Sequence, residues 1–274
     1  EIMKNRTVKS VLFAQEYPMG KLRVKQPFPS VKVDYPDPFL LLHHAKMKID
    51  PEKNLADEGV GPHPHRGFSP VTFIFKGGVH HRDSRGNNSV IYEGGVQWMN
   101  AGMGIIHSER PPADIFEHGG EQEIIQMWVN SPASAKMKEP EYHPLSAEAT
   151  PVWINPEGDS KVHVVTGNVL GLKGPVPTPT EVDSATIRLV EGEEISIPIQ
   201  SGHMAFIYLL DGEIHIAGYG LVEKENAVLF NDDGDQITFK GNATTRMLFM
   251  SGKPLNEPMQ SHGPFVMNTQ WELL

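Results

Sequence analysis

Short runs of alternating apolar and polar residues, separated by turn-forming residues, make up most of the chain. Residues 70–76 alternate in this way, the pair Gly77-Gly78 supplies a turn, and residues 122–130 form another run of strand length. Successive side chains of an extended strand point to opposite faces, so a period of two is typical of strands. Together with the frequent turns, this pattern predicts an all-β chain built from many short strands.

The second half of the chain repeats the first. Three blocks recur in the same order at similar spacing: 72–81 with 206–215, 95–102 with 227–234, and 125–132 with 246–254. Internal duplication of this kind indicates two copies of one structural unit. We therefore expect two related, jelly-roll-like β-barrels in tandem.

A polar stretch rich in lysine, glutamate and proline separates the two copies. It predicts a linker over residues 136–145, a first barrel over residues 1–135 and a second barrel over residues 146–274. We expect the C-terminal tail to pack back on the first barrel.

Composition and charge narrow the class of protein. Hydrophobic residues make up 39% and charged residues 21% of the 274 positions, as in a soluble globular protein. The net charge of −10 argues against a general nucleic-acid binder, which needs a basic surface. The sequence has no cysteine, which excludes disulfides and thiolate metal sites. No apolar run approaches the roughly 18 residues of a membrane span, and the first residues lack a signal-peptide core, so we expect a cytoplasmic protein.

A histidine pair and a later histidine–glutamate pair carry the strongest chemical signal. His63 and His65 stand two residues apart, as do His107 and Glu109 after a glycine-rich turn. At this spacing the members of each pair share one face of a strand. If the two strands are neighbours in a small barrel, three imidazoles and one carboxylate converge on one interior point. This donor set suits a divalent transition metal such as iron, manganese, nickel, copper or zinc, and predicts a metal-dependent protein of the cupin type.

The duplication predicts that only the first barrel binds metal. Its offsets place apolar residues or glycine opposite every proposed ligand: Ile197 opposite His63, Ile199 opposite His65, Phe239 opposite His107 and Gly241 opposite Glu109. None of these replacements can bind a metal ion through its side chain.

Adjacent histidines are the main competitors for a ligand role. His80 and His81 must point to opposite faces of a strand, so both cannot bind one metal with the same geometry. We interpret them as residues beside a turn that form hydrogen bonds with Arg82 and Asp83. The other histidines are interpreted as structural: His43, His44, His118, His143, His163, His203, His215 and His262.

Five motifs in order closely resemble the pirin family of bicupins. They lie at residues 61–68, 81–87, 96–102, 104–109 and 263–269, and the similarity covers nearly the whole chain. The resemblance implies a C-terminal cupin without metal. It also implies a ferrous or related divalent ion, cobalt included, in the N-terminal cupin, held by His63, His65, His107 and Glu109. Ser69-Pro70 departs from the family pattern RGFETVT, which changes one edge of the pocket but no ligand.

The resemblance also implies an activity. Bacterial pirins are associated with a quercetin 2,3-dioxygenase activity, so we expect a flavonol-like substrate to react with dioxygen at the metal. Glu109 is then a ligand throughout, or the base that accepts the hydroxyl proton of the substrate. Animal pirins are associated with a nuclear co-regulator role, so the alternative is a metal-binding regulatory protein that acts on a protein partner. Another enolizable substrate also stays open, and we expect a monomer.

Overall fold

The computed structural model describes residues 2–20 and 22–274. These residues form two compact β-barrels. The segments that build the two barrels alternate along the sequence. The first barrel consists of Glu16–Lys25, Phe39–Ala149 and Leu255–Leu274, and the second barrel consists of Glu1–Gln15, Gln26–Pro38 and Thr150–Pro254. The prediction of an all-β chain with two barrels is confirmed.

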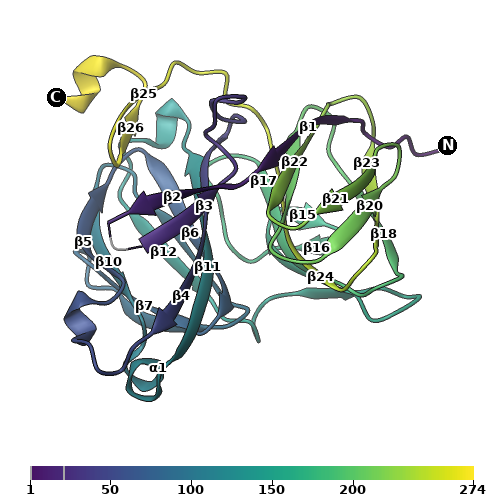
Figure 1. Cartoon of the computed structure of the whole chain (residues 1–274). Coiled ribbons are helices and arrows are strands. Elements are labelled where there is room, and N and C mark those ends of the chain that lie inside the picture. Colours follow the sequence, from purple (N-terminus) through teal and green to yellow (C-terminus); the bar gives the residue numbers. More distant parts are fainter. Residues whose placement is uncertain (1, 21) are drawn as a thin grey trace. The chain divides into compact units, whose positions relative to one another are not determined.

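A larger and a smaller antiparallel sheet form the first barrel (Figure 1). The larger sheet contains, in spatial order, β12 (Glu141–Leu145), β9 (Val96–Asn100), β6 (Phe68–Lys76), β11 (Gly120–Asn130), β4 (Phe39–Ile49), β3 (Leu22–Gln26) and β2 (Gln15–Met19). The smaller sheet contains β5 (Val60–His65), β10 (Ile105–Arg110), β7 (Gly78–Asp83) and β8 (Asn88–Tyr92). The predicted metal ligands all lie on β5 and β10, neighbouring strands of the smaller sheet.

The second barrel repeats this arrangement. Its larger sheet contains, in spatial order, β1 (Val8–Phe13), β22 (Asn226–Phe230), β19 (Met204–Leu209), β24 (Thr245–Gly252), β17 (Val182–Leu189), β14 (Lys161–Thr166) and β13 (Val152–Ile154). Its smaller sheet contains β18 (Glu194–Pro198), β23 (Gln236–Gly241), β20 (Glu213–Ile216) and β21 (Gly220–Glu223). The order β18-β23-β20-β21 therefore corresponds to β5-β10-β7-β8, as the sequence repeat predicts.

Short elements complete the two barrels. They are β15 (Asn168–Val169), β16 (Leu172–Lys173), β25 (Gln260–His262), β26 (Phe265–Met267), α1 (Ala113–His118) and the 3-10 turns η1 (Leu55–Asp57), η2 (Ala133–Ala135) and η3 (Gln270–Leu273). Within residues 2–20 and 22–274, no helix has both the length and the apolar character needed to cross a membrane.

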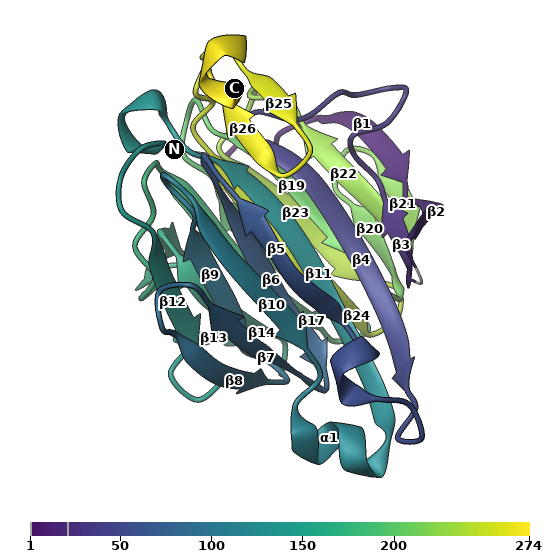
Figure 2. The same ribbon diagram turned by 90° about the vertical axis from the view of Figure 1, so that its left-hand side faces the viewer.

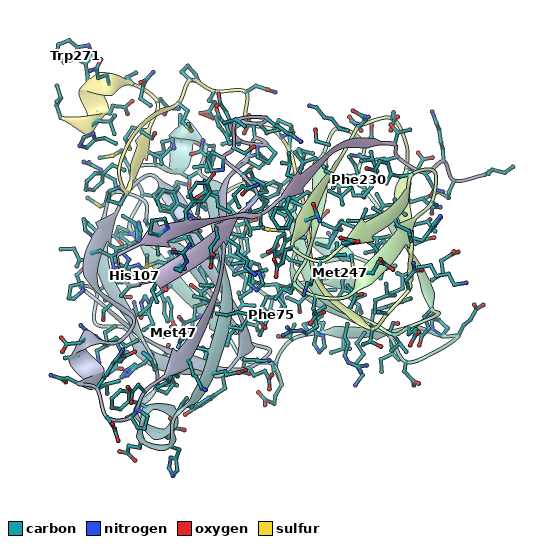
Figure 3. All side chains as sticks on the ribbon, in the orientation of Figure 1. Met47, Phe75, His107, Phe230, Met247 and Trp271 are labelled. Carbon is teal, nitrogen blue, oxygen red and sulfur yellow. The ribbon has the colours of Figure 1, made fainter. Side chains whose placement is uncertain are left out.

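Apolar packing replaces the predicted ligands in the second barrel. Ile197 and Phe239 are fully buried, and they share one core with Met247. Figure 3 labels Met247 in the second barrel. Full burial of each such side chain contributes roughly 1.5–3 kcal/mol to stability. The structure pairs Phe239 with Ile195 rather than with Ile197. The repeat offset is therefore displaced by two residues, which keeps each side chain on the same face of its strand.

The N-terminal segment groups with the second barrel, whereas the sequence division placed it in the first. Strand β1 pairs with β22 along the edge of the larger sheet, and the two strands lie side by side in Figure 1. Arg6, whose side chain is fully buried, donates hydrogen bonds to the backbone oxygens of His203 and Gln200 and forms an ion pair with Asp232 at 2.9 Å. Conversely, residues 255–274 group with the first barrel.

Candidate metal centre

Strands β5 and β10 bring the predicted histidines together. They pair in antiparallel fashion, with His107 opposite His63 and Ile105 opposite His65, and they run side by side in Figure 2. The register shifts between His107 and Glu109. The pairing of β10 with β7 stays regular over the same residues, so the extra residue lies in β5. Glu109 therefore keeps the face of β10 that His107 occupies.

The three imidazoles form a compact cluster inside the first barrel. Their ring centroids are separated by 4.7 Å for His63 and His65, 4.3 Å for His63 and His107, and 4.9 Å for His65 and His107. One nitrogen of each ring lies within 4.8 Å of the others. His65 and His107 are only 3% and 2% exposed, whereas His63 is half-buried. The cluster is therefore open to solvent mainly on the side of His63.

Burial keeps the three imidazoles neutral. It lowers the pKa of His63 and of His107, and it lowers the pKa of His65 to about 3. The Nδ1–H of His63 donates to the backbone oxygen of Gly61 at 2.7 Å, which leaves Nε2 with a free lone pair. Metal-binding histidines are neutral and commonly donate their second nitrogen to a backbone oxygen in this way.

Unpaired ring nitrogens show that a divalent metal ion fits this cluster. Both nitrogens of His65 and both of His107 are buried without a hydrogen-bond partner in the described part of the chain. A buried polar atom left unpaired costs about 1–3 kcal/mol. A metal ion that accepted a lone pair from each ring would offset part of this cost, so the donor set and its surroundings suit such an ion.

Glu109 lies next to the cluster as a buried carboxyl group. Its Oε1 is 3.7 Å from Nδ1 of His107 and accepts a hydrogen bond from the hydroxyl of Thr72 at 3.0 Å. Its Oε2 accepts one from Nε2 of Gln126 at 3.4 Å. Burial raises the pKa of Glu109 to about 7, although the bond from Thr72 opposes the shift. A divalent cation beside this carboxyl would favour its charged form.

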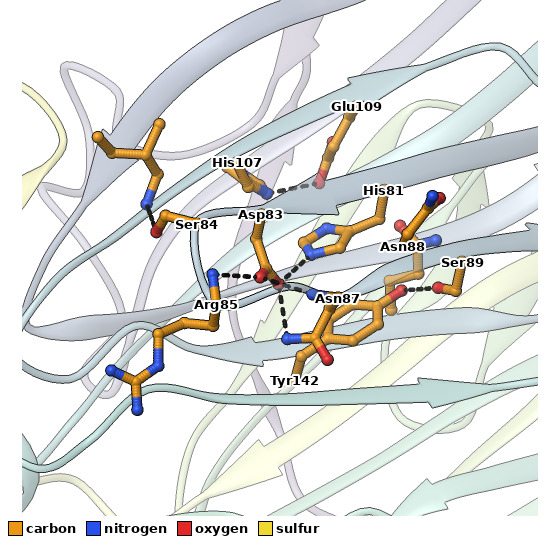
Figure 4. A network of polar contacts seen from close by, with 12 residues as sticks. His81, Asp83, Ser84, Arg85, Asn87, Asn88, Ser89, His107, Glu109 and Tyr142 are labelled. Carbon is orange, nitrogen blue, oxygen red and sulfur yellow. Dashed lines mark hydrogen bonds and ion pairs between the residues drawn. The ribbon is translucent and has the colours of Figure 1, made fainter.

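A further histidine enters the site from β7. His81 lies opposite Glu109 in the strand pairing, and its ring centroid is 5.4 Å from that of His107. One ligand atom from each of these three residues lies within 4.8 Å of the other two. His81 donates to Asp83 at 2.7 Å and stacks on the ring of Tyr142 at 4.0 Å (Figure 4). The sequence interpretation identified the hydrogen bond to Asp83 but missed the contact with the cluster.

The two adjacent histidines of β7 differ in environment, as strand alternation requires. The Nε2–H of His80 donates to Oδ1 of Asn88 at 2.5 Å near the surface, whereas His81 is buried. The sequence signal for His81 was its spacing of two residues from Asp83, which puts both side chains on one face.

A buried lysine fixes the turn that follows His65. The ammonium group of Lys136 donates to the backbone oxygen of Gly67 at 2.7 Å, to Oδ1 of Asn130 at 2.6 Å and to the backbone oxygen of Val266 at 3.1 Å. Gly67 has φ +86°, and a Cβ at this position would lie 1.8 Å from the oxygen of Val266. Strand β26 is therefore tied to the segment that carries His65.

His43, on β4, should make the stability of the first barrel depend on pH. Burial lowers its pKa from 6.5 to about 4. Because the folded-state pKa is below the unfolded value, the contribution to stability is fully present above pH 6.5 and is lost as the pH falls toward 4. We expect a loss of at most about 3 kcal/mol from this residue. Urea unfolding of metal-free protein at pH 7 and pH 4.5 measures it. His43→Gln should lose less stability on acidification, and an equal loss in both proteins would contradict the prediction.

Comparison with known proteins identifies relatives of the whole chain. The Pirin family model matches residues 21–129, and the model of the Pirin C-terminal cupin domain matches residues 184–274. Human pirin is 37% identical over 243 residues, which cover 86% of this chain and 79% of that protein. The crystal structure of a quercetin 2,3-dioxygenase from Acinetobacter baumannii has a TM-score of 0.91 at 31% identity, covering 98% of this chain and 94% of that one. The bacterial pirin YhhW of Escherichia coli, solved in complex with nickel(II), has a TM-score of 0.68 at 17% identity, covering 89% and 99% of the two chains, and supports the fold alone.

Proposed function

Because this chain belongs to the pirin family of bicupins, we propose that it is a metal-dependent dioxygenase that opens the ring of a flavonol-like substrate. His63, His65, His107 and Glu109 hold one divalent transition metal ion in the first barrel, and ferrous iron is the first ion to test. The observation that carries this proposal is the cluster of buried, neutral imidazoles with unpaired nitrogens beside a carboxyl group.

Two similar proteins support the proposed function. The Acinetobacter baumannii protein, named a quercetin 2,3-dioxygenase, matches almost the entire chain at 31% identity. The Escherichia coli pirin, which shares the fold, was solved with nickel(II), so nickel is one of the ions to test here.

The chain's own residues define the mechanism. A bound divalent ion supplies Lewis acidity, which lowers the pKa of a hydroxyl group that contacts it. The three histidines are neutral and each offers a nitrogen lone pair to the ion. The hydrogen bond from Nδ1 of His63 to the backbone oxygen of Gly61 holds His63 in the tautomer whose Nε2 is free to bind. Glu109 is placed to bind the ion or, as the carboxylate that a nearby cation favours, to accept the proton that the substrate hydroxyl loses. Thr72 donates to the carboxyl group and fixes its position in either role.

Oxygen uptake with quercetin should rise in proportion to bound metal. Metal-free protein is loaded separately with iron(II), manganese, cobalt, nickel, copper and zinc, and uptake on an oxygen electrode is compared with the metal content of the same sample. Each ion without protein controls for spontaneous oxidation of the flavonol. If no ion supports oxygen uptake, the proposed dioxygenase activity is contradicted. A regulatory metal-binding protein that acts on a protein partner is then favoured.

A further inference from the structure

A small apolar cavity reaches Glu109 from inside the first barrel. Its volume is about 30 Å³, and it is lined by Leu22, Ala45, Met47, Gly59, Val60, Val79, Glu109, Gln122 and Ile124. A single water molecule requires roughly 10–15 Å³, whereas sites for drug-sized organic ligands measure roughly 300–1,000 Å³. The cavity therefore has room for a molecule of two or three atoms and excludes a flavonol.

The two polar side chains of the cavity wall, Gln122 and Glu109, are held by hydrogen bonds to other residues. The side-chain amide of Gln122 donates to the backbone oxygen of Gly78 at 2.7 Å. The carboxyl oxygens of Glu109 accept hydrogen bonds from Thr72 and Gln126. A buried water needs about two to four polar partners, and cavities that lack them stay dry and bind apolar atoms or molecules. An apolar occupant is therefore favoured over water.

The cavity lies against a wider groove that is open to solvent. Leu22, Met47, Gly59 and Val60 line both the cavity and an open groove of about 570 Å³. Figure 3 labels Met47, which comes from the same barrel as His107. Dioxygen in the groove would therefore lie one layer of side chains from the cavity, on the side of the cluster where Glu109 lies.

We propose that this cavity is a binding site for dioxygen, from which the gas reaches the metal centre separately from the organic substrate. The proposal rests on the proposed oxygenase function for its ligand. It adds that Ala45, Val79 and Ile124 determine how well the protein captures dioxygen. These three residues act by shaping the cavity and contact neither the metal nor the flavonol.

Xenon tests the cavity without any reaction. In crystals of the full chain exposed to pressurised xenon, we expect an anomalous peak between Val79 and Ile124, because xenon occupies dry apolar cavities of this kind. Xenon that is absent there, or ordered water in its place, would overturn the proposal.

Filling the cavity tests its role in turnover. Ala45→Val adds two methyl groups to its wall, and Ala113→Val makes the same change on the exposed surface of α1. In metal-loaded enzyme, we expect Ala45→Val to raise the KM for dioxygen several-fold while leaving the metal content and the kcat at saturating dioxygen unchanged. Ala113→Val should match the parent protein. If the variant binds no xenon yet keeps its parental KM for dioxygen, the proposed site plays no part in oxygen capture.

The two experiments separate failure of this inference from failure of the proposed function. If the parent protein consumes no dioxygen with quercetin, the oxygenase proposal fails, and the xenon result alone decides whether the cavity binds small apolar molecules. If the parent protein consumes dioxygen but xenon is absent, only the cavity inference fails.

Discussion

Replacing His107 with alanine will remove bound metal and abolish oxygen uptake with quercetin. His107 belongs to both ligand clusters of the first barrel, one with His63 and His65 and the other with His81 and Glu109. Loss of a residue that only supports a ligand typically costs about 10–100-fold in metal affinity. Loss of a direct ligand should cost more than that, and the metal content after dialysis should fall close to zero.

The control for this prediction is His118→Ala, which removes an exposed histidine on α1 that belongs to neither cluster. Metal analysis and oxygen uptake should match the parent protein in this variant. Circular dichroism and urea unfolding show whether His107→Ala keeps the fold. A folded, metal-free His107→Ala protein that still consumes dioxygen would rule out the proposed mechanism.

Replacing Lys136 with methionine will strongly destabilise the first barrel. The side chain is 1% exposed, and its ammonium group is the donor for the oxygens of Gly67, Asn130 and Val266. Methionine fills a similar volume but leaves these three acceptors without that donor. Each buried group left unpaired costs about 1–3 kcal/mol, so we expect the free energy of unfolding to fall by about 3 kcal/mol or more. Metal affinity should also fall, because the segment that carries His65 loses its link to β26.

Lys138→Met provides a matched control, since Lys138 stands two residues further along and is exposed. Its free energy of unfolding should change by less than about 0.5 kcal/mol. Urea unfolding measures both variants, and calorimetric titration with nickel(II) measures the metal affinity. Equal stability of the two variants would show that the hydrogen bonds of Lys136 contribute little to the fold.

The predicted ligands illustrate how far sequence reasoning extends into the site. A spacing of two residues fixes the shared face within each pair, and the structure brings His63, His65 and His107 into one cluster. Glu109 also shares the face of His107, because the pairing of β10 with β7 is regular across both residues. That shared face does not determine which groups contact its carboxyl group. The hydroxyl of Thr72, which comes from the opposite sheet, holds the carboxyl group, and no local pattern indicates that contact.

His81 shows why the remainder of the site could not be predicted. Asp83, two residues further along the same strand, can accept a hydrogen bond from His81. The sequence therefore explained His81 without any contact with the candidate metal centre. The pairing of β7 with β10, which places His81 opposite Glu109, brings it there. A small apolar cavity beside Glu109 likewise depends on how side chains from separate strands fail to fill the space between them.

The sequence by itself determined the strand periodicity, the duplication into two barrels and the face on which each candidate ligand lies, because these depend on neighbours within a few residues or on direct comparison of two segments. The tertiary structure alone decided which distant strands pair, and hence that β1 joins β22 and groups with the second barrel. It also decided the environment of Glu109. Edge pairing, burial and charge state arise from contacts between segments far apart in the chain, and a period of two contains no information about those partners.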